Sequence, residues 1–270
     1  MIHVLYHDDL DGFAAAWSAN LALRRDPRKQ VYTRVQYGQK MPVIEDNSVV
    51  FILDFSYPRE ELEALASRCE VTVLDHHKTA EEALRGLPYC TFDMNKSGCR
   101  LAWEHFHPHM PCPDAILAVE NRDLWLLDRE YVREICAALE SYPRSFEEWD
   151  RMVIDIPKLL EEGKTLVRYI SKLVYSHTRD PLVAVIGGYD VPVVNATTLQ
   201  SEMANTLLEK YPKFPFATCY FDCPRGRIWS LRSREDFDVS AVAKLYGGGG
   251  HKQAAGFVVP FDMVTIKEMK

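Results

Sequence analysis

Two short segments of this chain carry the residue types of a metal site. His7–Gly12 has the sequence HDDLDG, and Asp75–His77 has the sequence DHH. Asp9 and Asp11 are one residue apart, so in an extended segment their side chains would point the same way. Carboxylates are hard oxygen ligands for Mg²⁺ or Mn²⁺, and imidazole favours Mn²⁺ over Mg²⁺. This mixture predicts two divalent cations, with Mn²⁺ preferred and Mg²⁺ or Co²⁺ also able to bind.

Both segments follow apolar runs of the kind that form buried strands, and so does a third acid, Asp54. Ligands of α/β proteins bind at the carboxyl ends of strands, so three such ends predict one shared polar site. Taken singly, an Asp-x-Asp pair caps a turn and a lone histidine is structural. Taken together they would repel one another unless cations neutralised them. Two cations about 3.5–4 Å apart can activate a water and clamp a phosphoryl oxygen. The candidate metal ligands are His7, Asp9, Asp11, Asp54 and His76.

A second group of candidate residues lies near the C-terminus. Gly247–Gly250 is followed at once by His251 and Lys252. Glycines let backbone N–H groups approach a ligand, as in phosphate-binding nests, although a flexible linker is the alternative. Upstream, Arg232 and Ser233 end an expected strand, and a guanidinium suits bidentate contact with phosphate. The residues of this second group are Arg232, Ser233, Gly248, Gly249, Gly250 and His251. A solvated strand-end arginine is the alternative for Arg232.

Strand and helix patterns alternate over the first 125 or so residues. We expect strands at Ile2–His7, Gln30–Tyr37, Ser48–Phe55, Val71–Asp75 and Tyr89–Met94. We expect helices at Gly12–Arg24, Pro58–Arg68 and Ser97–His107. This alternation predicts an α/β fold with a mostly parallel, doubly wound sheet covered by helices on both faces.

The remainder of the chain predicts a second, smaller domain of mixed α/β type. Residues 146–178 are helical in pattern and would connect the domains, and Thr178–Pro181 reads as a linker. We therefore expect a catalytic domain over 1–178 and a substrate-binding domain over 182–270, with the active site in the cleft between them. Expected elements of the second domain are strands at 182–186, 191–195, 216–222, 227–232 and 257–259, and helices at 199–211 and 239–246.

Bulk composition limits the function classes. The chain has 270 residues, 47% of them apolar, and a net charge of −7. The negative net charge argues against non-specific electrostatic binding of long nucleic acid. Its seven cysteines show no CxxC spacing, which favours reduced thiols and a cytoplasmic setting. We expect no signal peptide, and no stretch approaches the roughly 20 apolar residues that span a membrane.

These motifs together resemble the DHH phosphoesterase superfamily with its DHH-associated C-terminal domain. The resemblance extends over nearly the whole chain, in the family's order, and is strongest to the NrnB-type nano-RNases. The matching segments are HDDLDG at 7–12, Asp54, DHH at 75–77, NKSGCRLAWE at 95–104, Asp123 within NRDLW, SLRS at 230–233 and GGGGHKQAAGF at 247–257.

The resemblance implies a role for each matching residue. Asp9 and Asp54 would bind one metal; the other would be bound by Asp11, Asp54, His76 and Asp123. His77 would contact the scissile phosphate, and Asp75 would orient the histidines. The substrate's far phosphate or nucleotide would be held by Arg232, Ser233, Gly248, Gly249, Gly250 and His251. Many family members have a metal-binding histidine where this chain has Leu5. Either His7 would ligate from a shifted position, or the first metal would have one more water.

The activity that the resemblance implies is metal-dependent hydrolysis of short RNA or DNA oligonucleotides or linear dinucleotides, releasing mononucleotides. A phosphatase acting on 3′-phosphoadenosine 5′-phosphate would need the same metals and remains an alternative. A non-catalytic nucleotide sensor is a third possibility, which the presence of every acid disfavours. We expect no membrane partner, and the sequence leaves the oligomeric state open, with a homodimer among the forms that it allows.

Overall fold

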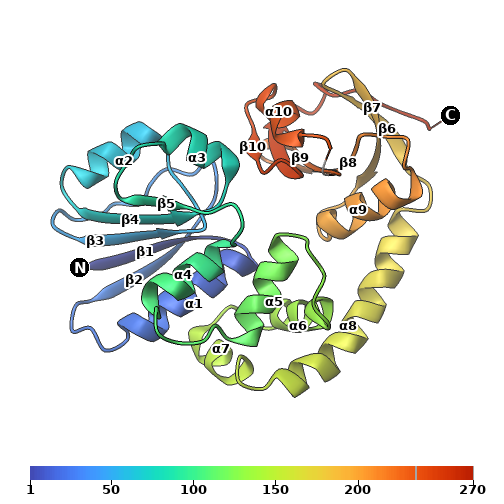
Figure 1. Cartoon of the computed structure of the whole chain (residues 1–270). Coiled ribbons are helices and arrows are strands. Elements are labelled where there is room, and N and C mark those ends of the chain that lie inside the picture. The colour runs from blue at the N-terminus through green and yellow to red at the C-terminus, as the bar shows by residue number, and fades with distance from the viewer. Residues whose placement is uncertain (235, 270) are drawn as a thin grey trace. The chain divides into compact units, whose positions relative to one another are not determined.

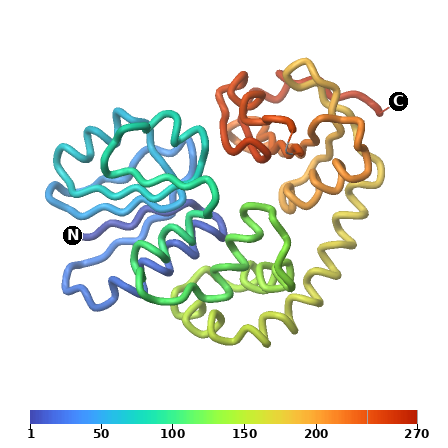
Figure 2. Tube along the Cα trace, in the orientation of Figure 1, coloured from blue at the N-terminus to red at the C-terminus, as the bar shows by residue number. Residues whose placement is uncertain are grey.

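A computed structural model describes residues 1–234 and 236–269 of the chain. The chain divides into two compact units, Met1–Val167 and Arg168–Lys270, and Figure 2 traces the backbone through both. The division falls within one long helix, α8 (Ile156–His177). The expected domain ranges of 1–178 and 182–270, and a cleft between them, stay predictions.

The first unit is built on a five-stranded parallel sheet (Figure 1). Its strands are β1 (Ile2–His7), β2 (Gln30–Val35), β3 (Val49–Leu53), β4 (Glu70–Asp75) and β5 (Cys90–Phe92). Their order in the sheet is β2-β1-β3-β4-β5, and every neighbouring pair is parallel. The chain proceeds to one side of β1 first and to the other side afterwards. The carboxyl ends of β1 and β3 therefore flank a topological switch point, where open α/β sheets bind ligands.

Helices cover both faces of this sheet, as predicted. Val4 and Tyr6 of β1 belong to one core cluster, together with Phe13 of α1 (Leu10–Leu23). Leu5, between them in sequence, belongs to another cluster, on the opposite face, with Leu62 of α2. This alternation is the two-residue side-chain period of a strand that is buried on both sides. The other helices of this unit are α2 (Arg59–Ala66), α3 (Lys78–Leu84), α4 (Gly98–Phe106), α5 (Asp114–Asp123), α6 (Val132–Ser141) and α7 (Phe146–Met152).

The observed helices differ from the expected ones in where one of them begins and in the presence of three further helices. Helix α1 begins at Leu10 rather than Gly12, because the Asp9 side chain caps it by accepting a hydrogen bond from the Gly12 amide at 2.8 Å. Helices α3, α5 and α6 were not expected as elements. Helix α3 has only seven residues and buries just Ala80 and Leu84, so its sequence carries little apolar periodicity.

The second unit contains a seven-stranded mixed sheet in the order β10-β11-β9-β8-β7-β6-β12. Only β7 and β8 pair in parallel among its described strands, so the predicted mixed α/β character is confirmed. Trp229 and Phe216 lie fully buried in its core. The elements are β6 (Leu182–Ile186), β7 (Tyr189–Asn195), α9 (Gln200–Lys210), β8 (Phe216–Cys223), β9 (Gly226–Ser233), α10 (Val239–Lys244), β10 (Gly249–Gly250), β11 (Ala254–Val259) and β12 (Ile266–Lys267).

Among the described residues, the longest and most apolar helices still fall short of what a membrane span requires.

Candidate metal centre

The end of β1 brings a histidine against two acids. His7 is the last residue of the strand, and its Nδ1 lies 2.7 Å from Asp9 Oδ2 and 3.6 Å from Asp54 Oδ2. The turn is tight at Gly12, where an added Cβ would lie 2.2 Å from the His7 carbonyl oxygen. Gly12 is therefore required for the close approach of this turn to the strand end.

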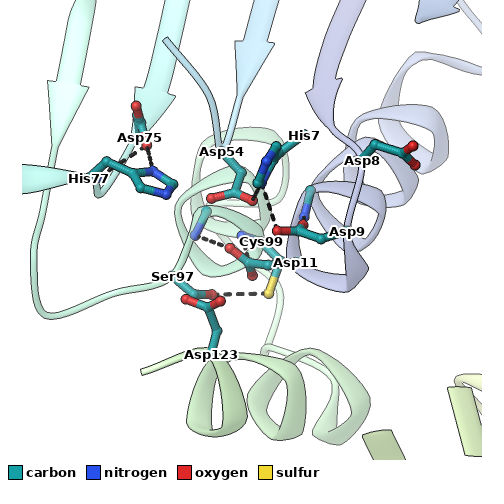
Figure 3. A network of polar contacts seen from close by, with 12 residues as sticks. His7, Asp8, Asp9, Asp11, Asp54, Asp75, His77, Ser97, Cys99 and Asp123 are labelled. Atoms are coloured by element: carbon teal, nitrogen blue, oxygen red, sulfur yellow. Dashed lines mark hydrogen bonds and ion pairs between the residues drawn. The ribbon is translucent and has the colours of Figure 1, made fainter. Parts of the chain in front are cut away.

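Asp54 occupies the middle of the cluster (Figure 3). It directly follows β3, is 1% exposed, and has a left-handed backbone with φ of 56°. Such a conformation is costly for a residue with a Cβ and is typical of functional sites. The Asp54 amide donates to the Leu74 carbonyl at 2.8 Å, which fixes the turn against the end of β4.

His76 lies on the other side of Asp54, against three carboxylates. Its Nε2 is 3.1 Å from Asp54 Oδ1, 3.4 Å from Asp123 Oδ2 and 3.7 Å from Asp11 Oδ2. Asp123 is the last residue of α5 and points toward the other carboxylates (Figure 3). The two oxygens of Asp54 thus face different partners, His7 on one side and His76 on the other.

The amino end of α4 holds Asp11 in place. The Gly98 and Cys99 amides donate to Asp11 at 2.7 and 3.1 Å, and Asp11 is 2% exposed. The first amides of a helix carry partial positive charge and have no partner within the helix, so a buried carboxylate is stabilised there. Gly98 also leaves room for Asp54, whose Cβ would lie 2.3 Å from a Cβ added at Gly98.

Asp75 pairs with His77, and its ligand atom lies within 4.8 Å of those of His77 and Asp54. Asp75 Oδ1 lies 2.7 Å from His77 Nδ1, and Oδ2 accepts a hydrogen bond from the Ser56 hydroxyl at 2.6 Å. Burial opposes its charge, yet the His77 imidazole holds the pKa of Asp75 below its ordinary value. A carboxylate that is this firmly paired acts on the histidine ring and its tautomer.

The buried acids strongly perturb one another. Burial and the nearby Asp11 and Asp9 carboxylates raise the pKa of Asp54 well above its ordinary value. Burial and Asp11 also raise the pKa of Asp123 to about 6. Burial opposes the charged form of His7, but Asp9 and Asp54 outweigh it and raise the pKa of His7 to about 10. The cluster thus has an excess of negative charge that favours bound protons or cations.

The donor atoms fit divalent cations. The sets of three groups whose ligand atoms lie within 4.8 Å of one another include His7 with Asp9 and Asp54, and Asp11 with Asp54 and His76. Asp54 belongs to both sets. Its buried Oδ1 makes no hydrogen bond of normal geometry with the described residues, as expected of an acceptor meant for a cation. Carboxylate and imidazole donors in this proportion suit Mn²⁺ or Mg²⁺.

The structure brings together the six predicted metal ligands, His7, Asp9, Asp11, Asp54, His76 and Asp123. Leu5, at the position where a histidine was expected by resemblance, is fully buried in the core cluster that contains Leu62. His7 follows on the same face of β1 and is the histidine that reaches the acids.

The predicted substrate residues of the second unit have partners within that unit. Arg232 donates to the Ser201 hydroxyl at 2.6 Å, and the Ser233 hydroxyl donates to the Phe237 carbonyl at 2.7 Å. The His251 amide donates to the Ala254 carbonyl at 2.8 Å. The part of these residues in substrate binding stays a prediction.

The glycine run has a packing explanation that the sequence did not suggest. A Cβ at Gly248 would lie 2.1 Å from the Gly256 carbonyl oxygen, and one at Gly250 would lie 2.5 Å from that of Ala254. Gly249 and Gly250 pair with β11, so the run forms an edge strand that lies close to its neighbour. Binding of an anion by Gly248, Gly249 and Gly250 stays a prediction.

Sequence reasoning missed Ser56, Gly98 and Cys99 as parts of the site. Gly98 and Cys99 lie within a segment noted for its family resemblance, and a glycine after a helix-capping Ser97 was the available signal. Ser56 lies two residues after Asp54, where nothing in the sequence distinguishes it from an ordinary turn serine.

Comparison with known proteins agrees with this geometry. The model of the DHH family N-terminal domain matches residues 1–132, which contain all six clustered ligands. Oligoribonuclease NrnB of Bacillus subtilis (strain 168) is 24% identical over 309 aligned positions, covering 98% of this chain and 75% of that protein.

A mimivirus protein is also similar. An uncharacterised protein of Acanthamoeba polyphaga mimivirus is 29% identical over 239 residues, which cover 81% of this chain. The chain spans 56% of the length of that relative.

A solved structure shares the fold. The pGpG-specific phosphodiesterase PggH of Vibrio cholerae aligns with a TM-score of 0.51 at 15% identity, covering 96% of this chain and 94% of that one. Residues 1–132 thus match the DHH family N-terminal domain, and nearly the whole chain is similar to NrnB.

Proposed function

We propose that this protein is a metal-dependent phosphodiesterase that hydrolyses short oligonucleotides or linear dinucleotides and releases mononucleotides. The observation that carries this proposal is Asp54, a strained and buried carboxylate whose two oxygens face two separate sets of ligand atoms. Two divalent cations, preferably Mn²⁺, would when bound supply an activated water and neutralise charge on the scissile phosphate.

Different residues of the chain would hold the cations, contact the scissile phosphate and bind the rest of the substrate. Asp9, Asp54 and His7 would hold one cation, and Asp11, Asp54, His76 and Asp123 the other. His77, oriented by Asp75 at 2.7 Å, would donate a hydrogen bond to a phosphate oxygen as negative charge builds up there. Arg232, Ser233, Gly248, Gly249, Gly250 and His251 would bind the far end of the substrate.

Two similarities support the substrate class. NrnB, which is similar over nearly the whole chain, is named an oligoribonuclease, and PggH is named a pGpG-specific phosphodiesterase. The net charge of −7 agrees with a short substrate, since a net negative charge disfavours association with a long polyanion.

The decisive experiment uses 5′-labelled RNAs of two to about ten nucleotides, together with 3′-phosphoadenosine 5′-phosphate, in Mn²⁺ and in EDTA. We expect mononucleotides to be released, fastest from the shortest RNAs, and only in the presence of metal. Asp11→Ala and His76→Ala should each abolish turnover while preserving the circular dichroism spectrum.

Other outcomes would reject the proposal in distinguishable ways. Release of inorganic phosphate from the bisphosphate alone would indicate a phosphomonoesterase. Nucleotide binding without turnover in Mn²⁺ would indicate a sensor, and undiminished turnover in His76→Ala would remove the proposed site.

A further inference from the structure

A cavity of about 410 Å³ opens beside the cluster of acids and histidines, entirely within the first unit. Its wall includes Tyr37 from the segment after β2, Phe55 and Tyr57 from the segment after β3, and Thr79 at the start of α3. Phe55 directly follows Asp54, and Thr79 lies two residues after His77. The volume is in the range of small-molecule binding sites.

Aromatic rings form much of this wall. The Tyr37 and Phe55 ring centroids are 4.6 Å apart, and those of Phe55 and Tyr57 are 4.9 Å apart. Phe55 and Tyr57 are buried, whereas Tyr37 is 46% exposed and presents ring surface to a ligand. Exposed aromatic rings in nucleic-acid-binding proteins are platforms on which bases stack, because every base has a flat π-face.

The aromatic wall also reaches the cluster of acids and histidines. The Tyr37 ring centroid lies 5.8 Å from that of His77 and 5.7 Å from that of His7. A flat group stacked on Tyr37 would therefore lie next to a phosphate held at the cluster. A nucleotide has both groups, a phosphate and a base, joined by one sugar.

Tyr57 adds an unsatisfied hydrogen-bond donor. Its side chain is 3% exposed, and its buried hydroxyl has no partner among the described residues. Burial, with a smaller contribution from the Glu61 carboxylate, raises the pKa of Tyr57 to about 12, so the hydroxyl keeps its proton at neutral pH. A buried polar group without a partner is unfavourable, and a ligand acceptor would relieve that cost.

We propose that this cavity binds the nucleobase next to the scissile phosphate, stacked on Tyr37 and accepting a hydrogen bond from the Tyr57 hydroxyl. Lys40, on the exposed rim of the cavity, would favour the anionic backbone. The proposal rests on the proposed function, since it assumes a nucleotide substrate, but base binding can be measured without turnover.

The first test measures base binding alone. The probe is 2-aminopurine ribonucleoside in EDTA, which has no phosphate and therefore needs no metal. Stacking quenches its fluorescence, so the wild-type protein should give saturable quenching. Tyr37→Ala should weaken binding roughly 5- to 100-fold, whereas Tyr37→Phe keeps the ring and should bind like the wild type. Tyr169→Ala, which removes an exposed tyrosine of α8, is the matched control and should also bind normally.

Tyr57→Phe tests the hydrogen bond. It keeps the ring and removes the hydroxyl, so we expect nucleoside binding to weaken about two- to tenfold. Saturable quenching that is the same in the wild type, Tyr37→Ala and Tyr57→Phe would overturn the proposal, and so would the absence of saturable quenching.

A second test asks whether the base contributes to turnover. Dinucleotides are compared with analogues that lack the base on the 5′ or the 3′ side of the phosphate. The wild type should prefer the complete substrate over one analogue, and Tyr37→Ala should reduce that ratio of kcat/KM values toward one. An equal loss on all substrates would show that Tyr37 only supports the histidines. Failure of the wild type on every RNA would reject the proposed function instead, and the nucleoside experiment would still test the cavity.

Discussion

At the scale of single residues, Asp54 is the central residue of the candidate site. It has a left-handed backbone, is almost completely buried, and is shared by both sets of ligand atoms. Strain and burial of this kind are unfavourable in the protein without metal, and they persist where the surroundings determine the conformation. We therefore expect Asp54 to lower the stability of the metal-free protein and to favour metal binding.

Replacing Asp54 by asparagine should separate those two effects. The raised pKa of Asp54 means that its ionised form destabilises the metal-free protein. Asp54→Asn should therefore raise Tm in EDTA, by about 2–4 °C for each kcal/mol of repulsion removed. Added Mn²⁺ should raise Tm in the wild type but not in the variant. Turnover should fall more than about a hundredfold, since even residues behind the metal ligands cost 10- to 100-fold.

Thermal melts with and without Mn²⁺ provide the measurement. The exposed Asp46→Asn is the matched control and should keep the Mn²⁺-induced shift. A variant of Asp54 that still gains stability from Mn²⁺ would contradict the assignment of Asp54 as a shared ligand.

Ser56 is expected to act indirectly, through Asp75 and His77. Its hydroxyl donates to Asp75 at 2.6 Å, and Asp75 in turn orients His77. Ser56→Ala should lower kcat about 10- to 100-fold while leaving the Mn²⁺ affinity unchanged, because the cation ligands are not touched. A combined Ser56→Ala and His77→Ala variant should be no slower than His77→Ala alone. Additive losses in the double variant would show that Ser56 does not act through His77.

At the scale of elements, the start of α4 holds the site together. Its first amides bind Asp11, and the missing side chain of Gly98 makes room for Asp54. Strand ends and the turns after them supply most of the candidate ligands, and Asp123 comes from the end of α5. The start of α4 contacts two of these residues, Asp11 and Asp54. A helix amino end suits that task because its amides are already aligned and unpaired.

A Gly98→Ala substitution should therefore disrupt the metal site through one methyl group. The added Cβ would lie 2.3 Å from Asp54 Cβ, so Asp54 or α4 must shift. We expect unfolding to become easier by about 1–3 kcal/mol and the Mn²⁺ affinity to fall. Gly188→Ala, in the second unit, adds a methyl group in open space and is the control. It should cost about 1–2 kcal/mol through its left-handed backbone and keep the Mn²⁺ affinity. Equal Mn²⁺ affinity in both variants would refute the spacing argument.

At the scale of the whole molecule, we expect the excess of negative charge to link metal binding to proton binding. The chain carries a net charge of −7 and buries several acids at one sheet edge. The pKa of Asp123 is raised to about 6, above its ordinary value of about 3.9. The folded, metal-free protein thus binds more protons than the unfolded chain between these values, and Asp123 makes it less stable as pH rises through them.

Mn²⁺ binding should therefore strengthen as pH rises through about 6. Cations compete with protons for the carboxylates, so Mn²⁺ should raise Tm more at about pH 7.5 than at about pH 5. Calorimetric titrations near pH 6 in buffers of different ionisation enthalpy should show proton release on Mn²⁺ binding. A Tm shift that does not change with pH would show that Asp123 does not take part.

Much of this architecture could be predicted from the sequence, because the relevant signals are local. Apolar runs such as Val49–Leu53 and Val71–Leu74 mark strands that are buried on both faces, and the polar residues after them mark strand ends. In a parallel sheet all such ends lie at one edge, so the grouping of His7, Asp54 and His76 follows from topology. The sheet, its two helical layers and the mixed second unit were predicted in this way.

Only the tertiary structure decided how the groups at that edge are held. The contact of Ser56 with Asp75 and that of Gly98 with Asp54 join segments that are 19 and 44 residues apart, and residue type alone does not encode such pairs. Short helices such as α3 escape prediction because they bury too few side chains to show a period. The glycine run likewise forms an edge strand only because β11 lies beside it. The sequence by itself determined which groups meet, because strand ends are local features. The spacing and orientation of these groups depend on packing between distant segments, which only the folded chain contains.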